Sequence, residues 1–297
     1  MIKPLSIPAV VMFLGAAPLL AQSNSSPRLE DLTHPEVRAR QIEVALLPIG
    51  STDPHANHLP YTTDALSAQI LAQRVAAKAN AMGAKVLVLP TMPYGVNSNQ
   101  APNPYAQSIR PATLMQFIKD VVDVSEHQGI RKIVILNAHG GNTTTIAATL
   151  RELYASNPKV FAAQVDYWVS YADKGKELLK TGGAHANEEE TSIALELFPD
   201  KVHMNRAVKA KDTPFAMPSL KVPYIHFMRP WMYVSDNTGT GDPTQGTAEK
   251  GRVLVGDWDT RDYTVAKLAA RVGYVFQNPD EQLFCRSVHA EVAFGPR

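Results

Sequence analysis

Three short segments of the chain concentrate the residue types that bind divalent cations and move protons. Carboxylates and imidazoles supply the oxygen and nitrogen ligands that suit zinc and manganese. Histidine and glutamate are also the usual groups in general acid–base catalysis. The segments are residues 50–64 (GSTDPHANHLPYTTD), 137–142 (NAHGGN) and 185–192 (HANEEETS).

The first segment follows an apolar run that ends at Ile49. Asp53 and His55 are two positions apart, so in an extended backbone both side chains project to the same side. Asp64 lies where the next helical pattern begins, and the chain can fold back to bring it near the other two. A cation site is one interpretation. The other makes Asp64 a helix cap and the histidines turn residues.

The second segment directly follows another apolar run, which ends at Leu136. Its two glycines allow a tight turn from a strand into a helix, and Asn142 can cap that helix. His139 is then presented at the end of the strand, where a metal ion or a substrate can reach it. A structural loop with a solvent-facing histidine is the alternative.

The third segment places acidic residues at the start of a predicted helix. If this helix begins near Asn187, then Glu188 and Glu190 lie in its first turn. The helix dipole also favours acids there, and we interpret Glu189 in that way. His185, just before the turn, is the unusual feature.

The elements that position these segments alternate between strands and helices. Near-continuous apolar runs predict strands that are covered on both faces, as in a parallel sheet, and the alternation predicts an α/β layered fold. Ligands of such sheets bind beyond the carboxyl ends of the strands, where the three segments fall. The predicted strands are residues 43–49, 85–89, 132–136 and 160–165, and the predicted helices are residues 65–81, 113–127, 143–155, 188–197 and 247–276.

Composition narrows the class of protein. The chain has 297 residues, 45% of them hydrophobic, and a formal net charge of +1, which disfavours nucleic acid or an acidic membrane surface as partner. The single cysteine, Cys285, forms no intrachain disulfide and builds no cysteine-rich zinc site.

The N-terminus predicts export. Residues 1–21 contain Lys3 and then a short apolar run, which favours a cleaved signal peptide over a membrane span. A buried N-terminal strand is the alternative. We therefore expect a periplasmic or secreted protein, with residues 22–297 forming one domain and no membrane insertion after signal removal.

The order and wording of the three segments resemble the creatininase (creatinine amidohydrolase) family of metal-dependent amidohydrolases. A fourth segment, late in the chain, extends the resemblance over most of the mature sequence. The matching residues are 50–64, 137–142, 185–192 and 241–251, and the family patterns are GSxExHGxHLP followed by TD, NGHGGN, HAGExETS and GDPTxxTxxKG.

This resemblance implies a three-layer α/β/α sandwich with a mostly parallel sheet, two divalent metal ions (zinc or manganese) and a homo-oligomer, since creatininase itself is a hexamer. By position, Asp64 would bridge the metals, Asp53 and His139 would hold one of them, and His55 the other. The resemblance also makes His185 the proton shuttle, and Glu190 would orient it or a ligand histidine. A hydroxide activated by the metals would attack an amide carbonyl.

The chain departs from the family pattern at several positions. Asp53 replaces a glutamate and is one methylene shorter, and Ala56 replaces a glycine, which would narrow the pocket. Creatininase has a further ligand, a glutamate, where this chain has Gly141. In the Gly-Gly variant of the family a glutamate follows the next motif's histidine by three residues, and we hypothesise that Glu188 supplies the missing carboxylate.

The substrate is less defined by these residues. Ser98 lies in a stretch similar to one that lines the creatininase substrate pocket, and Gly140 stands where creatininase has a tyrosine. Trp168 and Trp231 are candidates for enclosing a flat substrate, although core packing is the alternative. We expect a small-molecule amide or lactam substrate. The competing hypothesis is a catalytically silent binding protein that keeps the fold.

Overall fold

The computed structural model describes residues 26–211, 213–214, 217, 219 and 228–256. The predicted signal peptide and the predicted helical residues beyond 256 lie outside this range. Within it, no helix combines the length and the apolar character needed to span a membrane.

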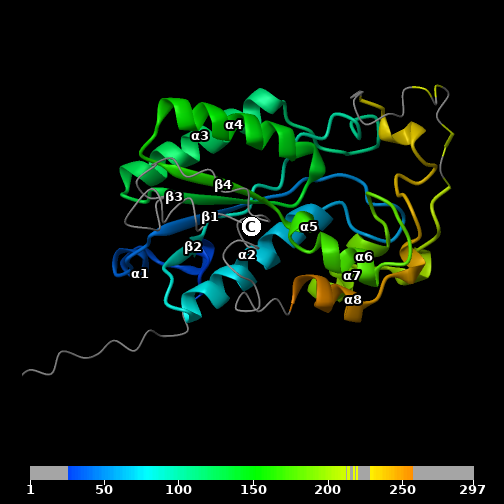
Figure 1. Cartoon of the computed structure of the whole chain (residues 1–297), viewed down its shortest axis with the longest axis horizontal. Helices are drawn as coiled ribbons and strands as arrows, with labels where there is room; N and C mark the ends of the chain where they lie inside the picture. Colours follow the sequence, from blue (N-terminus) through cyan, green and yellow to red (C-terminus); the bar gives the residue numbers. More distant parts are fainter. Residues whose placement is uncertain (1–25, 212, 215–216, 218, 220–227, 257–297) are drawn as a thin grey trace, which may run out of the picture.

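Four parallel strands form a sheet in the order β2-β1-β3-β4 (Figure 1). β1 and β3 are in register from Val44 opposite Lys132 to Ile49 opposite Asn137, and β4 continues this alignment with Asp166 opposite Asn137. The carboxyl ends of these three strands therefore lie side by side. The strands are β1 (Val44–Ile49), β2 (Val86–Val88), β3 (Lys132–Asn137) and β4 (Phe161–Asp166).

Helices cover both faces of the sheet (Figure 1). One layer contains α3 and α4, and the other contains α2, with α7 and α8 packed together beyond it. The main helices are α2 (Thr63–Ala81), α3 (Pro111–His127), α4 (Thr143–Ser156), α7 (Glu188–Leu197) and α8 (Ala248–Val255). Shorter ones are α1 (His34–Arg38), α5 (Tyr167–Ser170) and α6 (Ala172–Leu178).

Alternation along the strands divides the core in two. Leu47 and Ile135 belong to one buried cluster with Ile118 of α3, whereas the adjacent Leu46 and Leu136 belong to a second cluster with residues of α2. Successive strand side chains point to opposite faces of a sheet, so two separate apolar clusters show that both faces are covered. The predicted α/β/α sandwich with a parallel sheet is confirmed.

Most predicted elements match the structure within two residues. The last predicted helix begins as expected, but α8 ends at Val255, before Gly256. Sequence analysis missed α1, α5 and α6, because these helices are short and show no long apolar period.

The α3 layer gives a direct test of the two-sided core. We expect Ile118→Ala to lower the free energy of unfolding by about 2–5 kcal/mol, since the side chain is fully buried. Val124→Ala, on the same helix but 58% exposed, should change it by less than about 0.5 kcal/mol. Urea unfolding followed by circular dichroism would measure both, and equal effects would contradict the described packing.

Candidate metal centre

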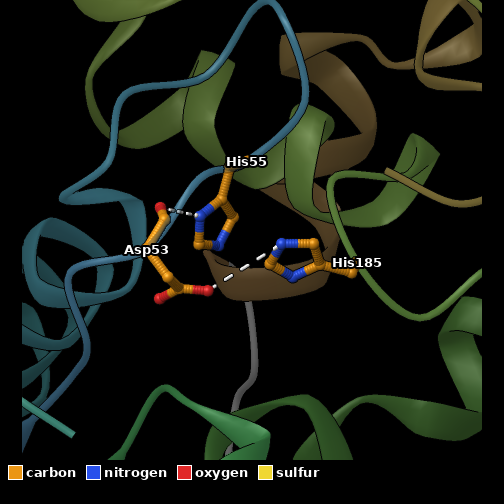
Figure 2. Close-up of side chains that lie close together, drawn as sticks. All are labelled: Asp53, His55 and His185. Atoms are coloured by element: carbon orange, nitrogen blue, oxygen red, sulfur yellow. Dashed lines mark hydrogen bonds and ion pairs between the residues drawn. The ribbon is translucent and has the colours of Figure 1, made fainter. Parts of the chain in front are cut away.

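The loop after β1 places two of the predicted metal ligands. Asp53 and His55 are completely buried, and His55 Nδ1 lies 2.9 Å from the backbone oxygen of Asp53 (Figure 2). A histidine that donates one ring N–H to a carbonyl offers the lone pair of its other nitrogen to a cation. The loop therefore presents Nε2 of His55 as a ligand atom.

Asp64, in the first turn of α2, lies between two histidines that follow different strands. Its Oδ1 is 3.0 Å from His55 Nε2, and its Oδ2 is 2.7 Å from His139 Nδ1. Each carboxylate oxygen thus faces a different ring nitrogen. This is the arrangement expected of a carboxylate that bridges two positively charged positions.

Backbone clamps at the end of β3 hold His139 in place. The backbone N–H of His139 donates to Asn137 Oδ1 at 3.1 Å, and Asn137 Nδ2 donates to the His139 backbone carbonyl at 3.0 Å. Asn137 Nδ2 also lies 2.6 Å from Asp166 Oδ1 at the end of β4. The first asparagine of the NAHGGN segment therefore orients the histidine.

Only glycine fits at position 141. A Cβ there would lie 2.1 Å from the Val96 carbonyl oxygen and 2.6 Å from His139 Nε2. Asn142 keeps Val96 in this place, because its Oδ1 accepts the Val96 N–H at 2.8 Å while its Nδ2 donates to the Gly50 carbonyl. The glutamate ligand of creatininase has no room here.

His185 reaches the group from the loop before α7. Its Nε2 lies 2.8 Å from the Pro54 carbonyl oxygen, 3.1 Å from Gln100 Nε2 and 3.9 Å from Asp53 Oδ2 (Figure 2). The ring centroids of His185 and His55 are 4.2 Å apart. Burial lowers the pKa of His185 to about 4. Because a carbonyl and an amide group both face Nε2, this nitrogen has a partner with or without its proton.

Glu190 approaches from the first turn of α7. Its Oε2 accepts the N–H of Ala186, next to His185, and a carboxylate oxygen lies within 4.8 Å of ligand atoms on His55 and Asp64. The Asn187 side chain caps α7 by accepting the Glu190 N–H at 3.0 Å. Glu190 therefore faces the group.

Carboxylates dominate the electrostatics of the site. Burial alone would lower the pKa of His55 and His139, but Asp64 and Asp53 raise both above the usual histidine value. Burial would raise the pKa of Asp64, and the two histidines outweigh this effect and lower it. Burial also raises the pKa of Glu190. The site therefore attracts positive charge.

The donor set fits divalent cations. Both carboxylate oxygens of Asp53 are buried and have no hydrogen-bond partner in the described part of the chain. A buried carboxylate without a partner is costly unless a cation compensates it. Three sets of ligand atoms lie close enough to hold an ion, namely Asp53, Asp64 and His139; His55, Asp64 and Glu190; and Asp53, His55 and His185.

The hypothesis that Glu188 supplies the missing carboxylate requires correction. Glu188 Oε2 accepts the backbone N–H groups of Lys180 and Thr181 at 2.9 and 2.7 Å, and its Oε1 accepts from Lys250 Nζ. Residues two apart on an α-helix point about 200° apart, so only one of Glu188 and Glu190 can face the site. Glu190 is the one that does.

The two predicted substrate residues lie at the surface. Ser98 and Gly140 are exposed, and a Cβ at Gly140 would meet no atom within 4 Å. The neighbouring Gln100 is buried and contacts His185 instead. His58 lies in none of the ligand sets found in the described residues, and its Nε2 lies 2.8 Å from the Thr191 hydroxyl.

Sequence reasoning missed the contacts of Gln100 and Lys250 and the strained backbone around the site. Ala56 has a φ of +53° and Thr238 a φ of +68°. At position 56 a signal existed, because the family motif has glycine there, and glycine adopts positive φ without strain. The consequence expected for Ala56 was a narrower pocket, whereas the structure shows backbone strain.

Fold and site together define an α/β protein with a buried histidine–carboxylate group, suited to divalent cations, at the carboxyl edge of a parallel sheet. The sequence profile of creatininase, described as creatinine amidohydrolase, matches residues 30–261. The chain therefore belongs to the creatininase family of hydrolases.

Characterised relatives differ in their substrates. The chain is 30% identical over 198 residues to the creatinine amidohydrolase of Pseudomonas putida. This match covers 60% of this chain and 74% of that protein. It is 29% identical over 213 residues to the mycofactocin precursor peptide peptidase of Mycolicibacterium smegmatis, covering 71% of this chain and 78% of the peptidase. A 49-residue stretch, 16% of the chain, is 53% identical to a protein of Pyrococcus abyssi assigned as an ABC transporter ATP-binding protein, of which it covers 19%.

Solved structures agree with the family. A Bacteroides fragilis protein assigned as a creatinine amidohydrolase superposes with a TM-score of 0.71 at 30% identity, covering 77% of this chain and 90% of that one. Creatininase structures at 25% and 26% identity are described as a manganese form and a Zn–Zn type.

The Glu188–Lys250 pair predicts a large stability effect. The Glu188 side chain is fully buried and that of Lys250 is 13% exposed. Lys250→Met leaves this buried carboxylate with neutral hydrogen-bond donors but no counter-charge, so it should cost about 3 kcal/mol. Lys174→Met, which removes a pair with exposed Glu177, should cost less than about 1 kcal/mol. Chemical denaturation would compare them. A loss at Lys250 no larger than that at Lys174 would contradict the described pair.

The strain at Ala56 predicts a stabilising substitution. Left-handed backbone costs a non-glycine residue roughly 1–2 kcal/mol, and glycine loses about 0.5–1 kcal/mol more entropy on folding. Ala56→Gly should therefore raise the free energy of unfolding by about 0.5–1 kcal/mol. An equivalent exposed substitution inside α2, Ala77→Gly, should lower it by about 1 kcal/mol. Thermal unfolding of both variants would check the opposite signs.

Proposed function

We propose that the protein is a metal-dependent amidohydrolase that cleaves a cyclic amide or a related C–N bond of a small molecule. The contacts of Asp64 carry this proposal. Its two oxygens face His55 and His139 separately, and the carboxylate of Asp53 beside them lacks a partner among the described residues. A protein that only binds an organic molecule has little need for such a group.

Two cations, zinc or manganese, would share Asp64. Asp53 and His139 complete one ligand set, and His55 and Glu190 complete the other. When bound, the cations supply polarisation of a carbonyl group and a lowered pKa for a neighbouring water molecule.

Asp53 lies beside two imidazoles despite its short side chain. Its carboxylate oxygens lie 3.9 Å from both His139 Nδ1 and His185 Nε2. The backbone N–H of Asp53 donates to the Tyr61 carbonyl at 3.0 Å, which fixes the loop close to the group. Both imidazoles therefore lie near the Asp53 carboxylate, although neither forms a hydrogen bond with it.

His185 is the group that moves the proton in this proposal. Hydrolysis adds the hydroxyl of water to the carbonyl carbon and its proton to the amide nitrogen, which leaves only after protonation. His185 Nε2 accepts that proton, holds it against the Pro54 carbonyl and passes it to the nitrogen. Asp53 Oδ2, 3.9 Å away, stabilises the charged ring during the transfer.

An amide is common to the substrates named for the two relatives described above, the creatinine amidohydrolase and the peptidase. Creatinine carries a cyclic amide, and the peptidase cleaves a peptide bond, so the two named activities share the C–N bond. The cyclic amide is our narrower proposal. Export and assembly into a homo-oligomer are further proposals, supported by the composition of residues 1–21 and by the family resemblance.

Metal content and hydrolysis of the purified protein test the function. We expect about two equivalents of zinc or manganese per chain, about one after Glu190→Gln, and almost none after Asp64→Ala, because Asp64 belongs to both ligand sets. Amide hydrolysis should fall by at least about 100-fold in both variants. Glu189→Gln, one residue from Glu190 but in none of the ligand sets, should keep metal and activity.

Two results would overturn the proposal. Full metal content in Asp64→Ala would remove the bridging role. A metal-loaded protein with no turnover of cyclic or linear amides would favour the silent binding protein.

A further inference from the structure

An aromatic side chain stands directly against the proposed proton shuttle. The rings of Trp231 and His185 have centroids 5.2 Å apart and an interplanar angle of 75°. The other tryptophan with a described ring contact, Trp168, meets Tyr167 instead, with centroids 5.6 Å apart. Of the two tryptophans considered above, Trp231 is thus the one beside the metal centre.

Trp231 is held in this position by its neighbours. Its backbone N–H donates to the Asn99 carbonyl at 2.7 Å, in the same segment as Gln100, whose side chain contacts His185. Its indole N–H donates to the Thr238 carbonyl. Since that donor is engaged, the indole offers a substrate only apolar ring surface.

Thr238, which holds the indole, is itself strained. It is a β-branched residue at a φ of +68°, a conformation that such residues rarely adopt. Its hydroxyl accepts the Ala56 N–H at 3.1 Å and donates to the Pro54 carbonyl at 3.3 Å, so it ties the Trp231 segment to the loop that carries the metal ligands. Strain of this kind persists where the surroundings over-determine the backbone, and it is frequent at ligand-binding sites.

We infer that Trp231 is a specificity-determining residue, and that its indole with the His185 imidazole forms a corner selecting flat cyclic amides over extended acyclic ones. The inference rests on the proposed function. A planar ring that lies against the indole meets the nearly perpendicular imidazole edge-on, with its amide nitrogen toward the proton shuttle. An extended peptide presents no comparable flat face, so it gains less from this wall.

Hydantoin, a planar cyclic amide, and N-acetylglycinamide, an acyclic one, are suitable probes for the metal-loaded protein. Trp231→Ala should raise KM for hydantoin about 3–10-fold and leave kcat within about 2-fold, because the lost contact is equal in ground and transition states. KM for N-acetylglycinamide should change by less than about 2-fold. Trp231→Phe should restore most of the hydantoin affinity, and Tyr154→Ala, an exposed aromatic on α4, serves as the control.

Hydantoin binding measured by equilibrium dialysis separates this inference from the proposed function. Wild-type protein that binds hydantoin but hydrolyses neither hydantoin nor any other cyclic or linear amide would overturn the proposed function, while the binding ratio of wild type to Trp231→Ala would still decide the inference. An unchanged ratio, an equal loss for both probes, or no binding of hydantoin by the wild type would overturn the role of Trp231.

Discussion

A buried aspartate held between two histidines is the interaction on which the rest of this structure depends. An ionised carboxylate is expensive to bury, and Asp64 is compensated only because His55 and His139 approach its two oxygens from separate loops. That approach requires the ends of β1 and β3 to coincide, which the parallel register of Ile49 with Asn137 ensures. The three-layer fold then supplies the apolar burial that stabilises the sheet, which the charged group cannot provide. Apolar clusters on both faces of the sheet stabilise the strands whose ends carry the polar group.

Neutral amide side chains complete this arrangement without adding charge. Asn137 clamps the backbone on both sides of His139, and Asn142 joins the loops that contain Gly50 and Val96. Each uses both donor and acceptor, which aspartate could not do, because an ionised carboxylate accepts but does not donate. The motif that follows β3 therefore contains one candidate ligand, His139, surrounded by residues that orient it.

The fold class and the clustering of Asp53, His55, Asp64 and His139 could be predicted from the sequence because they depend on local patterns. Apolar runs and helical periods identify the strands and long helices, and the carboxyl ends of parallel strands converge whatever the details of packing. The choice between Glu188 and Glu190 could not be made in this way, because it depends on how α7 is rotated against its neighbours. Lys250 lies more than 60 residues along the chain from Glu188 and donates a hydrogen bond to its carboxylate. No local sequence pattern predicts this pairing. The exposure of Ser98 also depends on packing, since its neighbours Asn97 and Gln100 take the buried positions of the same loop.

The absence of a side chain at Gly141 and the position of Glu190 are related features of this site. The Val96 carbonyl and the His139 ring occupy the space that a side chain at position 141 would need, so the β3 loop cannot provide a third carboxylate. The candidate third carboxylate, Glu190, lies on α7, so its position depends on the placement of this helix. Contacts outside the histidine–carboxylate group fix that placement. Glu188 ties its first turn to Lys180 and Thr181 and to Lys250 of α8, and a Cβ at Gly251 would lie 2.0 Å from the Ser192 carbonyl, so α8 packs closely on α7. The late GDPTxxTxxKG segment, which has no ligand of its own, thus contributes to the metal centre by fixing the helix that carries Glu190.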